Sequence, residues 1–150
     1  MTNINQPIFT LRQASSSDFD VIYNLKKSSV RPYVEKIWGW DEEYQYNDFT
    51  ADFRQIEKFE VVEVDRGFIG FVQTSTHNNT LELIEIHLLP QYRSQGIGST
   101  IIANIINFAK DRNMDISIGC FKENTGAKAL YLRLGFKLIE ETDTHFILKY

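Results

Sequence analysis

The sequence predicts an α/β fold of the α+β kind, in which one mixed and mostly antiparallel sheet of about seven strands is flanked by helices. Three observations predict it. The 150 residues suit a single domain, and a hydrophobic content of 43% provides for one core. The hydrophobic patterns follow one another as strand, helices, three strands, helix, strand, helix and two strands. We therefore expect one domain over residues 1–150.

The first third of the chain predicts a strand followed by helices. Residues 8–13 alternate as a strand, and the serines and aspartate of residues 15–18 offer an N-cap for a helix. Residues 30–57 have a helical composition and many aromatic side chains. We expect this helical segment to be broken near Pro32 and near Gly39.

The middle of the chain predicts an antiparallel meander. Its three strands are residues 59–64, 68–75 and 81–89, which are rich in β-branched and aromatic side chains. Tight turns join them at residues 65–67 and 77–80.

The last third predicts two helices and three strands. Residues 99–112 form a helix with an apolar face on the sheet, and residues 116–121 form a short buried strand. A second helix covers residues 125–134, and residues 136–141 and 145–150 form a closing hairpin. The apolar face of the first helix comprises Ile101, Ile102, Ile105, Ile106, Phe108 and Ala109.

Charge and composition exclude several classes of protein. The net charge of −4 argues against a general nucleic-acid binder, which usually presents a basic face. No run of about 18 apolar residues occurs, so we expect no membrane span. The single Cys120 and the absence of a signal-peptide pattern indicate a cytoplasmic protein. His77 and His145 have no ligand spacing around them, so we assign no metal site.

A glycine pattern between the third meander strand and the next helix predicts an anion site. Arg93, Gly96 and Gly98 have the spacing R-x-x-G-x-G. Glycines let the backbone turn sharply and approach a ligand, and the first N–H groups of the helix then point outward, which suits a pyrophosphate. A P-loop is excluded because no Gly-Lys pair exists, and a dinucleotide fingerprint needs a third glycine. The alternative is that these glycines only form a strand-to-helix turn.

A second motif, NTGAKALYLRLGF at residues 124–136, lies one helix and one strand beyond YRSQGIGS at residues 92–99. Together these motifs resemble the GNAT superfamily of acetyl-CoA-dependent N-acetyltransferases, and the resemblance covers the whole chain. It implies a GNAT-like sheet that splays between its fourth and fifth strands, here residues 81–89 and 116–121. The pantetheine arm of acetyl-CoA is expected to enter that gap and to pair with the unpaired strand edge.

The same resemblance implies a set of cofactor-binding positions and two chemical roles. The N–H of Leu88 is expected to donate to the thioester oxygen, which stabilises a tetrahedral oxyanion. Tyr131 is expected to be the general acid for the departing thiolate; the alternative is a tyrosine packed between helix and sheet. The cofactor-binding positions are Ile86, His87, Leu88, Arg93, Ser94, Gln95, Gly96, Ile97, Gly98, Ser99, Asn124, Ala127 and Tyr131.

The base that deprotonates the acceptor has three candidates on one strand. Glu85 is the first choice, directly or through a water, because a desolvated carboxylate near the gap has a raised pKa. By the period of two, Glu85 and His87 face one side and Glu82 the other, unless a bulge changes the count. The alternative is that all three are solvated edge residues.

The expected reaction is direct attack of a primary amine on acetyl-CoA in a ternary complex. Tyr33, Trp38, Trp40 and Glu82 are expected to bind a small-molecule amine, the tryptophans by cation–π contacts, although tryptophans at helical spacing are also common core residues. Acidic side chains attract such an amine; they are Glu35, Asp41, Glu42 and Glu43. Two alternatives stay open, a non-catalytic acyl-CoA-binding or sensing module, and an acetyltransferase for a protein N-terminus or lysine. Dimers are frequent among such domains, so a homodimer is an expectation of the resemblance.

Overall fold

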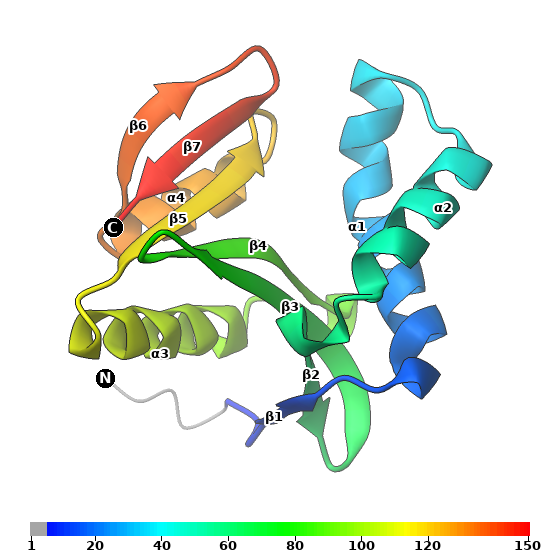
Figure 1. The fold of residues 1–150 in the computed structure, drawn as a ribbon, viewed down its shortest axis with the longest axis horizontal. Helices are drawn as coiled ribbons and strands as arrows, with labels where there is room; N and C mark the ends of the chain where they lie inside the picture. Colours follow the sequence, from blue (N-terminus) through cyan, green and yellow to red (C-terminus); the bar gives the residue numbers. More distant parts are fainter. Residues whose placement is uncertain (1–5) are drawn as a thin grey trace.

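The computed structural model describes residues 6–150, whose strands form a single seven-stranded sheet (Figure 1). The strand order is β1-β2-β3-β4-β5-β7-β6, and all neighbours are antiparallel except β4 and β5, which are parallel. The predicted mixed, mostly antiparallel sheet is confirmed. The strands are β1 Thr10–Gln13, β2 Phe59–Val64, β3 Gly67–His77, β4 Thr80–Leu88, β5 Asp115–Phe121, β6 Lys137–Glu141 and β7 His145–Lys149.

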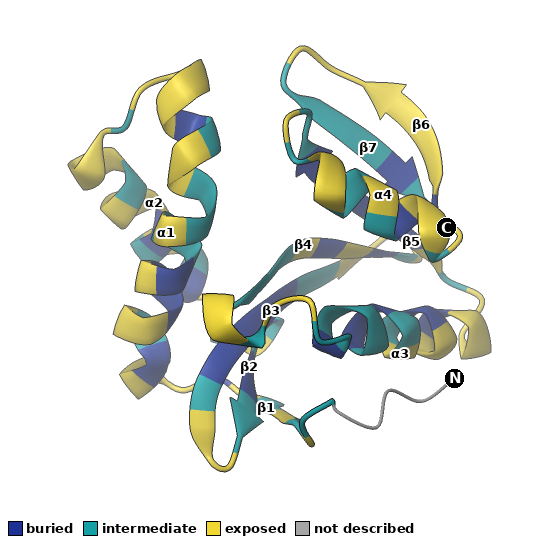
Figure 2. Ribbon diagram, turned by 180° about the vertical axis from the view of Figure 1, so that it is seen from behind, coloured by how far each residue is buried: buried dark blue, intermediate teal, exposed yellow. Residues whose placement is uncertain are grey.

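Helices cover both faces of this sheet, and each face has its own apolar cluster (Figure 2). Helices α1 (Phe19–Ile37) and α2 (Glu42–Phe53) pack on β2 and β3 through aromatic side chains such as Phe49. Helices α3 (Ile97–Asp111) and α4 (Thr125–Arg133) pack on the other face, where isoleucines of α3 meet β3, β4 and β5. Successive residues of a strand contribute to opposite clusters, as the pleat requires.

Tight turns join the meander strands as predicted. Asp65 and Arg66 have φ of 51° and 64°, and Asn78 and Asn79 have φ of 48° and 60°. Two consecutive left-handed residues match the right-handed twist of the strands that they connect.

Three details differ from the sequence predictions. Helix α1 does not break at Pro32 but continues to Ile37, because burial of Val34 and the stacking of Tyr33 on Phe121 of β5 offset the lost backbone hydrogen bond. The helix instead ends before Gly39, whose φ of 81° suits glycine. Strand β1 begins only at Thr10, and Ile8 is 90% exposed. Phe108 lies at the margin of the apolar stripe of α3 and stacks on Arg112 instead of the sheet.

A bulge in β4 changes which side chains face which helices. The register with β3 shifts between the pairs Thr74–Leu83 and Gln73–Glu85, so Ile84 is the extra residue. Leu83 before the bulge and Ile86 after it both join the cluster of α3. Glu82, Glu85 and His87 therefore share the face of α1, so the bulge changes the period-two count for Glu82, which is the exception that the sequence analysis left open.

The sheet splays where β4 and β5 part. Their parallel pairing runs from Thr80–Asp115 to Leu83–Ile118, and the rest of β5 pairs only with β7. The expected splay between the fourth and fifth strands is thus present. Beyond Leu83, the edge of β4 that faces away from β3 lies open. This open edge of β4 and the first turn of α3 lie beside the same gap.

Candidate functional site

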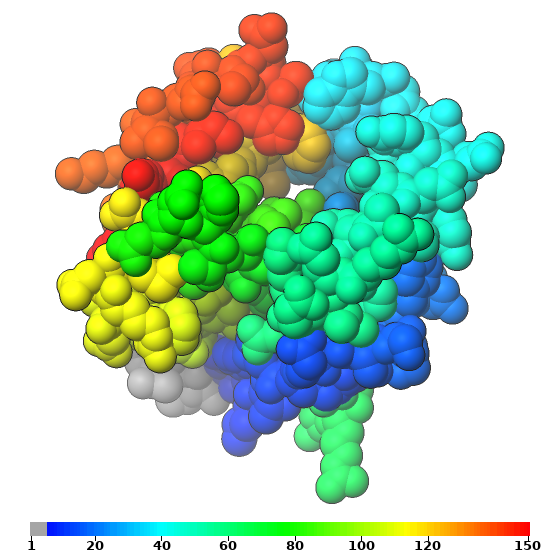
Figure 3. Space-filling view, in the orientation of Figure 1, coloured from blue at the N-terminus to red at the C-terminus, as the bar shows by residue number. Residues whose placement is uncertain are grey.

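A cleft of about 1100 Å³ occupies the splay. It runs between α1 on one side and α4 on the other, with β4, β5 and β7 as its floor and the first turn of α3 at one end. The space-filling view shows the molecular surface hollowed between the C-terminal hairpin and α1 (Figure 3). Both sequence motifs contribute to the lining, so the structure brings them together.

The glycine loop lies at one end of the cleft and has the backbone geometry expected of an anion cradle. Gly96 is the N-cap of α3 with φ of 86°, and Ser94 is also left-handed, so the backbone turns sharply into the helix. A Cβ built on Gly98 meets no atom within 4 Å, which leaves open space beside the free N–H groups of the first turn. The helix dipole adds a partial positive charge there. Arg93 turns its Nε to the carbonyl oxygen of Leu88 (2.9 Å) and steadies the loop against β4.

Two of the predicted loop positions turn their side chains away from the cleft. Ile97 is fully buried in the core under α3. Gln95 donates to the carbonyl oxygen of Gln91 (2.7 Å). At these two positions the backbone alone is left to meet a ligand, since neither side chain lines the cleft.

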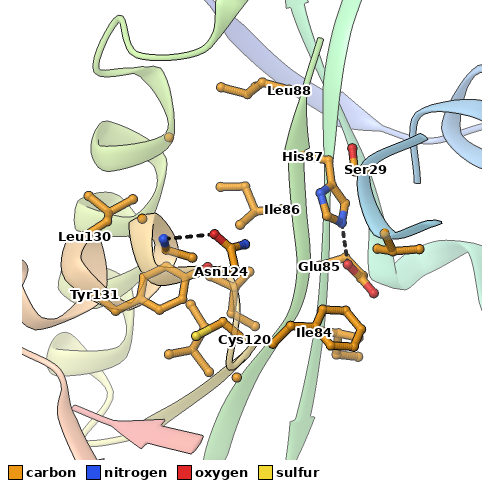
Figure 4. Close-up of a pocket in the computed structure, with 18 of the residues that line it drawn as sticks. Ser29, Ile84, Glu85, Ile86, His87, Leu88, Cys120, Asn124, Leu130 and Tyr131 are labelled. Atoms are coloured by element: carbon orange, nitrogen blue, oxygen red, sulfur yellow. Dashed lines mark hydrogen bonds and ion pairs between the residues drawn. The ribbon is translucent and has the colours of Figure 1, made fainter. Parts of the chain in front are cut away.

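The open edge of β4 presents main-chain groups toward the cleft. The N–H of Leu89 donates to the carbonyl oxygen of Ile69 on β3 (2.7 Å). Because amides alternate in direction along a strand, the N–H of Leu88 points away from β3, and that of Ile86 does the same. The two side chains point toward α3 and α4, away from His87 (Figure 4).

Asn124 and Tyr131 lie across the cleft from this edge (Figure 4). Asn124 caps α4 by accepting from the N–H of Ala127 (3.1 Å), which fixes the start of the helix. Tyr131 is 7% exposed and lines the cleft with Cys120. Burial, with smaller contributions from Cys120 and Glu85, raises the pKa of Tyr131 above its usual value of 10. The phenol therefore carries its proton at neutral pH.

Glu85 and His87 form a hydrogen-bonded pair on the opposite, α1 side of β4 (Figure 4). Lys26 of α1 lies 3.7 Å from the other carboxylate oxygen of Glu85. Burial raises the pKa of Glu85, but the hydrogen bond from His87 and the nearby positive charge of Lys26 outweigh it, so the net pKa is lowered. The expectation of a raised Glu85 pKa is wrong, because it weighed burial alone, whereas the interaction with His87, with a smaller contribution from Lys26, outweighs the effect of burial.

Aromatic rings close the end of the cleft away from the cradle. Tyr33 of α1 stacks on Phe121 of β5 with ring centroids 5.0 Å apart, and Phe121 contacts His145 of β7 at 4.4 Å. Lys36 pairs with Glu123 (2.6 Å) just outside this stack. Sequence reasoning identified Tyr33 and missed Phe121 and His145, because their position depends on the pairing of β5 with β7.

The two tryptophans do not line this cleft. Trp38 is 62% exposed. The indole N–H of Trp40 donates to Glu42 (2.7 Å), and its ring makes a cation–π contact with Arg31. Three of the four acidic side chains expected to attract an amine also have partners within the chain: Glu35 pairs with Arg31, Glu42 with Lys27, and Asp41 caps α2. Glu82, by contrast, lines the cleft.

Residues 6–150 contain no group of three or more side chains arranged to hold a metal ion. Among them, no helix has the length and apolar character needed to cross a bilayer.

Comparisons with known proteins agree with this geometry. A model of the acetyltransferase (GNAT) family matches residues 19–136. An uncharacterized N-acetyltransferase of Methanocaldococcus jannaschii is 28% identical over 86% of the chain, which spans 61% of that protein. A spermidine N(1)-acetyltransferase of Thermoplasma acidophilum is 28% identical over 53% of the chain and 49% of that protein. The PaiA N-acetyltransferase of the same organism, solved with coenzyme A, superposes with a TM-score of 0.73 at 20% identity, covering 95% of this chain and 98% of that one.

Proposed function

The chain belongs to the acetyltransferase (GNAT) family, and from this we propose that it transfers the acetyl group of acetyl-CoA to a primary amine of a small molecule. The observation that carries the proposal is the joining of two features in one cleft, the free helix start at Gly96–Gly98 and the open edge of β4. Coenzyme A needs both, because its pyrophosphate is an anion and its pantetheine arm carries amide groups.

The cofactor is proposed to bind along the β4 edge as an extra strand. The main chain of Ile86, whose N–H points away from β3, would pair with the pantetheine amides, whereas that of His87 alternates toward β3. The loop from Arg93 to Ser99 would hold the pyrophosphate. Asn124 and Ala127, at the start of α4, are proposed to contact the cofactor from the other side of the cleft.

Two groups are proposed to serve the thioester. The N–H of Leu88 would donate to its oxygen and stabilise the oxyanion that forms on attack, a contribution worth on the order of 10²–10³ in rate. Tyr131 would give its proton to the departing sulfur. Its raised pKa supports this role, because the proton is present over the whole neutral range.

The acceptor is proposed to enter on the α1 side of β4. There the Glu85–His87 pair supplies the proton acceptor for the amine, and Glu82 adds negative charge that attracts it. The stack of Tyr33 and Phe121 narrows this end, which favours a small amine over an extended polypeptide. The spermidine N(1)-acetyltransferase among the relatives supports polyamines as the first compounds to try.

The test is free-thiol release from acetyl-CoA in the presence of polyamines, aminoglycosides, amino acids and short peptides, with calorimetric binding of acetyl-CoA measured in parallel. Turnover with a small amine is the expected result. Turnover only with peptides would instead establish a protein acetyltransferase, and binding without any turnover would favour a sensing module. Failure to bind acetyl-CoA would contradict the proposal as a whole.

A further inference from the structure

Both carboxylate oxygens of Glu85 are already in use. One oxygen accepts a hydrogen bond from Nε2 of His87, and the other faces Nζ of Lys26 at 3.7 Å. An ionised carboxylate only accepts hydrogen bonds, so His87 must donate, and its proton therefore resides on Nε2. A substrate proton would have to displace one of these partners before reaching Glu85.

His87 has the free position that Glu85 lacks. Its ring packs against Phe71 of β3 at 5.5 Å and its side chain lines the cleft with 19% of its surface exposed. The hydrogen bonds found within residues 6–150 include none to its Nδ1. In the neutral imidazole with its proton on Nε2, Nδ1 carries the lone pair.

His87 also lies next to the residue whose N–H is proposed to bind the thioester oxygen. It directly precedes Leu88, whose N–H points to the open edge of β4, where the thioester is proposed to lie. A carboxylate that holds one nitrogen of an imidazole fixes its tautomer and orientation and stabilises the imidazolium that forms, as in hydrolase triads. These contacts suit His87 to accept a proton and Glu85 to hold the imidazole in place.

We propose that Nδ1 of His87 accepts the proton of the acceptor amine, while Glu85 is a positioning residue that holds the imidazole and is itself held by Lys26. This inference rests on the proposed acetyl transfer and assigns the base within the pair.

The proton and electron balance is complete with these groups. An ammonium acceptor gives one proton to Nδ1, and the freed nitrogen lone pair forms the C–N bond to the thioester carbon. The C–S bond then breaks with its electron pair going to sulfur, which takes the phenol proton of Tyr131. The second proton of the nitrogen replaces the one that Tyr131 gave up. One turnover thus releases one proton, which leaves from His87.

Charged and titratable groups reach this pair from every element around it. Lys26 approaches from α1, and His145 on β7 and Tyr131 on α4 feel the charge of Glu85 across the cleft. On α2, Asp52 accepts from Gln73 of β3, which lies opposite Glu85 in register. Of these, His145 is a second imidazole, and burial lowers its pKa below the usual 6.5.

The first experiment compares the turnover of His87→Gln and Glu85→Gln with that of the unaltered enzyme, with His77→Gln as the control imidazole, since His77 lies at the exposed end of β3. We expect His87→Gln to lower kcat about 10²–10⁴-fold with unchanged acetyl-CoA affinity. Glu85→Gln should lower kcat less and move the rising limb of the kcat–pH profile to lower pH, because the lost charge no longer stabilises the imidazolium. A larger loss in Glu85→Gln than in His87→Gln would overturn the assignment.

The second experiment needs no turnover, and it separates this inference from the proposed function. Two-bond ¹H–¹⁵N spectra report which nitrogen of each histidine carries the proton, and His87→Gln assigns the signals. We expect His87 protonated on Nε2 and bare on Nδ1, with the two tautomers mixed in Glu85→Gln. A proton on Nδ1 of the unaltered protein would refute the inference. An enzyme inactive towards every amine would instead refute the proposed function.

Discussion

Replacing Gly98 with valine should weaken acetyl-CoA binding at the proposed cradle and leave the stability of the fold nearly unchanged. The ideal Cβ of Gly98 contacts no atom within 4 Å, and its φ is outside the left-handed region, so the protein has room for a side chain. Valine is also a better helix residue than glycine, by a few tenths of a kcal/mol. We therefore expect the free energy of unfolding to change by less than about 0.5 kcal/mol.

The binding free energy of acetyl-CoA should change much more than the free energy of unfolding. A valine at Gly98 fills the space in front of the free N–H groups of Ile97, Gly98 and Ser99 and keeps the pyrophosphate from at least two of them. A hydrogen bond to a charged group contributes about 1.5–3 kcal/mol, so the loss is about 3–6 kcal/mol, or roughly 10²–10⁴-fold in Kd.

Calorimetric titration of acetyl-CoA and a denaturant unfolding curve measure the two quantities on the same preparation. Gly67→Val in the β2–β3 hairpin is the matched control, since Gly67 lies outside the cleft. Gly96→Val is a poorer test, because Gly96 has φ of 86° and its Cβ would approach Gln6 at 3.2 Å. A Gly98→Val protein that binds acetyl-CoA as tightly as the unaltered chain would refute the cradle assignment.

Three further changes test other parts of the molecule. Tyr131→Phe should lower kcat about 10²–10⁴-fold and leave acetyl-CoA affinity unchanged, and an unchanged rate in the variant removes Tyr131 as the acid. Because burial raises the Tyr131 pKa above 10, kcat of the unaltered enzyme should not fall between pH 7 and 9 through loss of this proton. Asp18→Asn should lower the free energy of unfolding at pH 7 by about 2 kcal/mol, because hydrogen bonds from Arg12 hold the Asp18 pKa near 2 instead of 3.8. That contribution is present above pH 3.8 and is lost as the pH falls through 2, so urea unfolding curves of the variant and the unaltered protein should converge in acid. Phe121→Ala opens the aromatic stack and should raise kcat/KM for bulky amines relative to small ones, whereas an unchanged ratio in a competition assay would show that Phe121 does not limit acceptor size.

The cofactor side of the site was predictable because it depends on local sequence. A glycine at a left-handed N-cap, as at Gly96, leaves a signature at fixed offsets from the helix that follows it, and Asn124 marks the start of α4 in the same way. The succession of strands and helices along the chain also follows from patterns within each segment. Pro32 was misjudged for the complementary reason: the local cost of a proline is outweighed by packing on a sheet that only the whole fold creates.

The acceptor side depends on contacts between distant segments, so its chemistry could not be predicted. Glu85 illustrates this, because Lys26, 59 positions earlier in the chain, adds to the lowering of its pKa by the neighbouring His87. A bulge at Ile84 also brings Glu82 to the same face as Glu85. Phe121 and His145 meet only because β7 inserts between β5 and β6. We therefore expect substitutions along α1 and at the ends of β5 and β7 to change the proposed acceptor preference without touching the cradle. The prediction is that pairs of residues from different elements set this preference, and double-mutant cycles across Tyr33 and Phe121 should then show non-additive changes in kcat/KM.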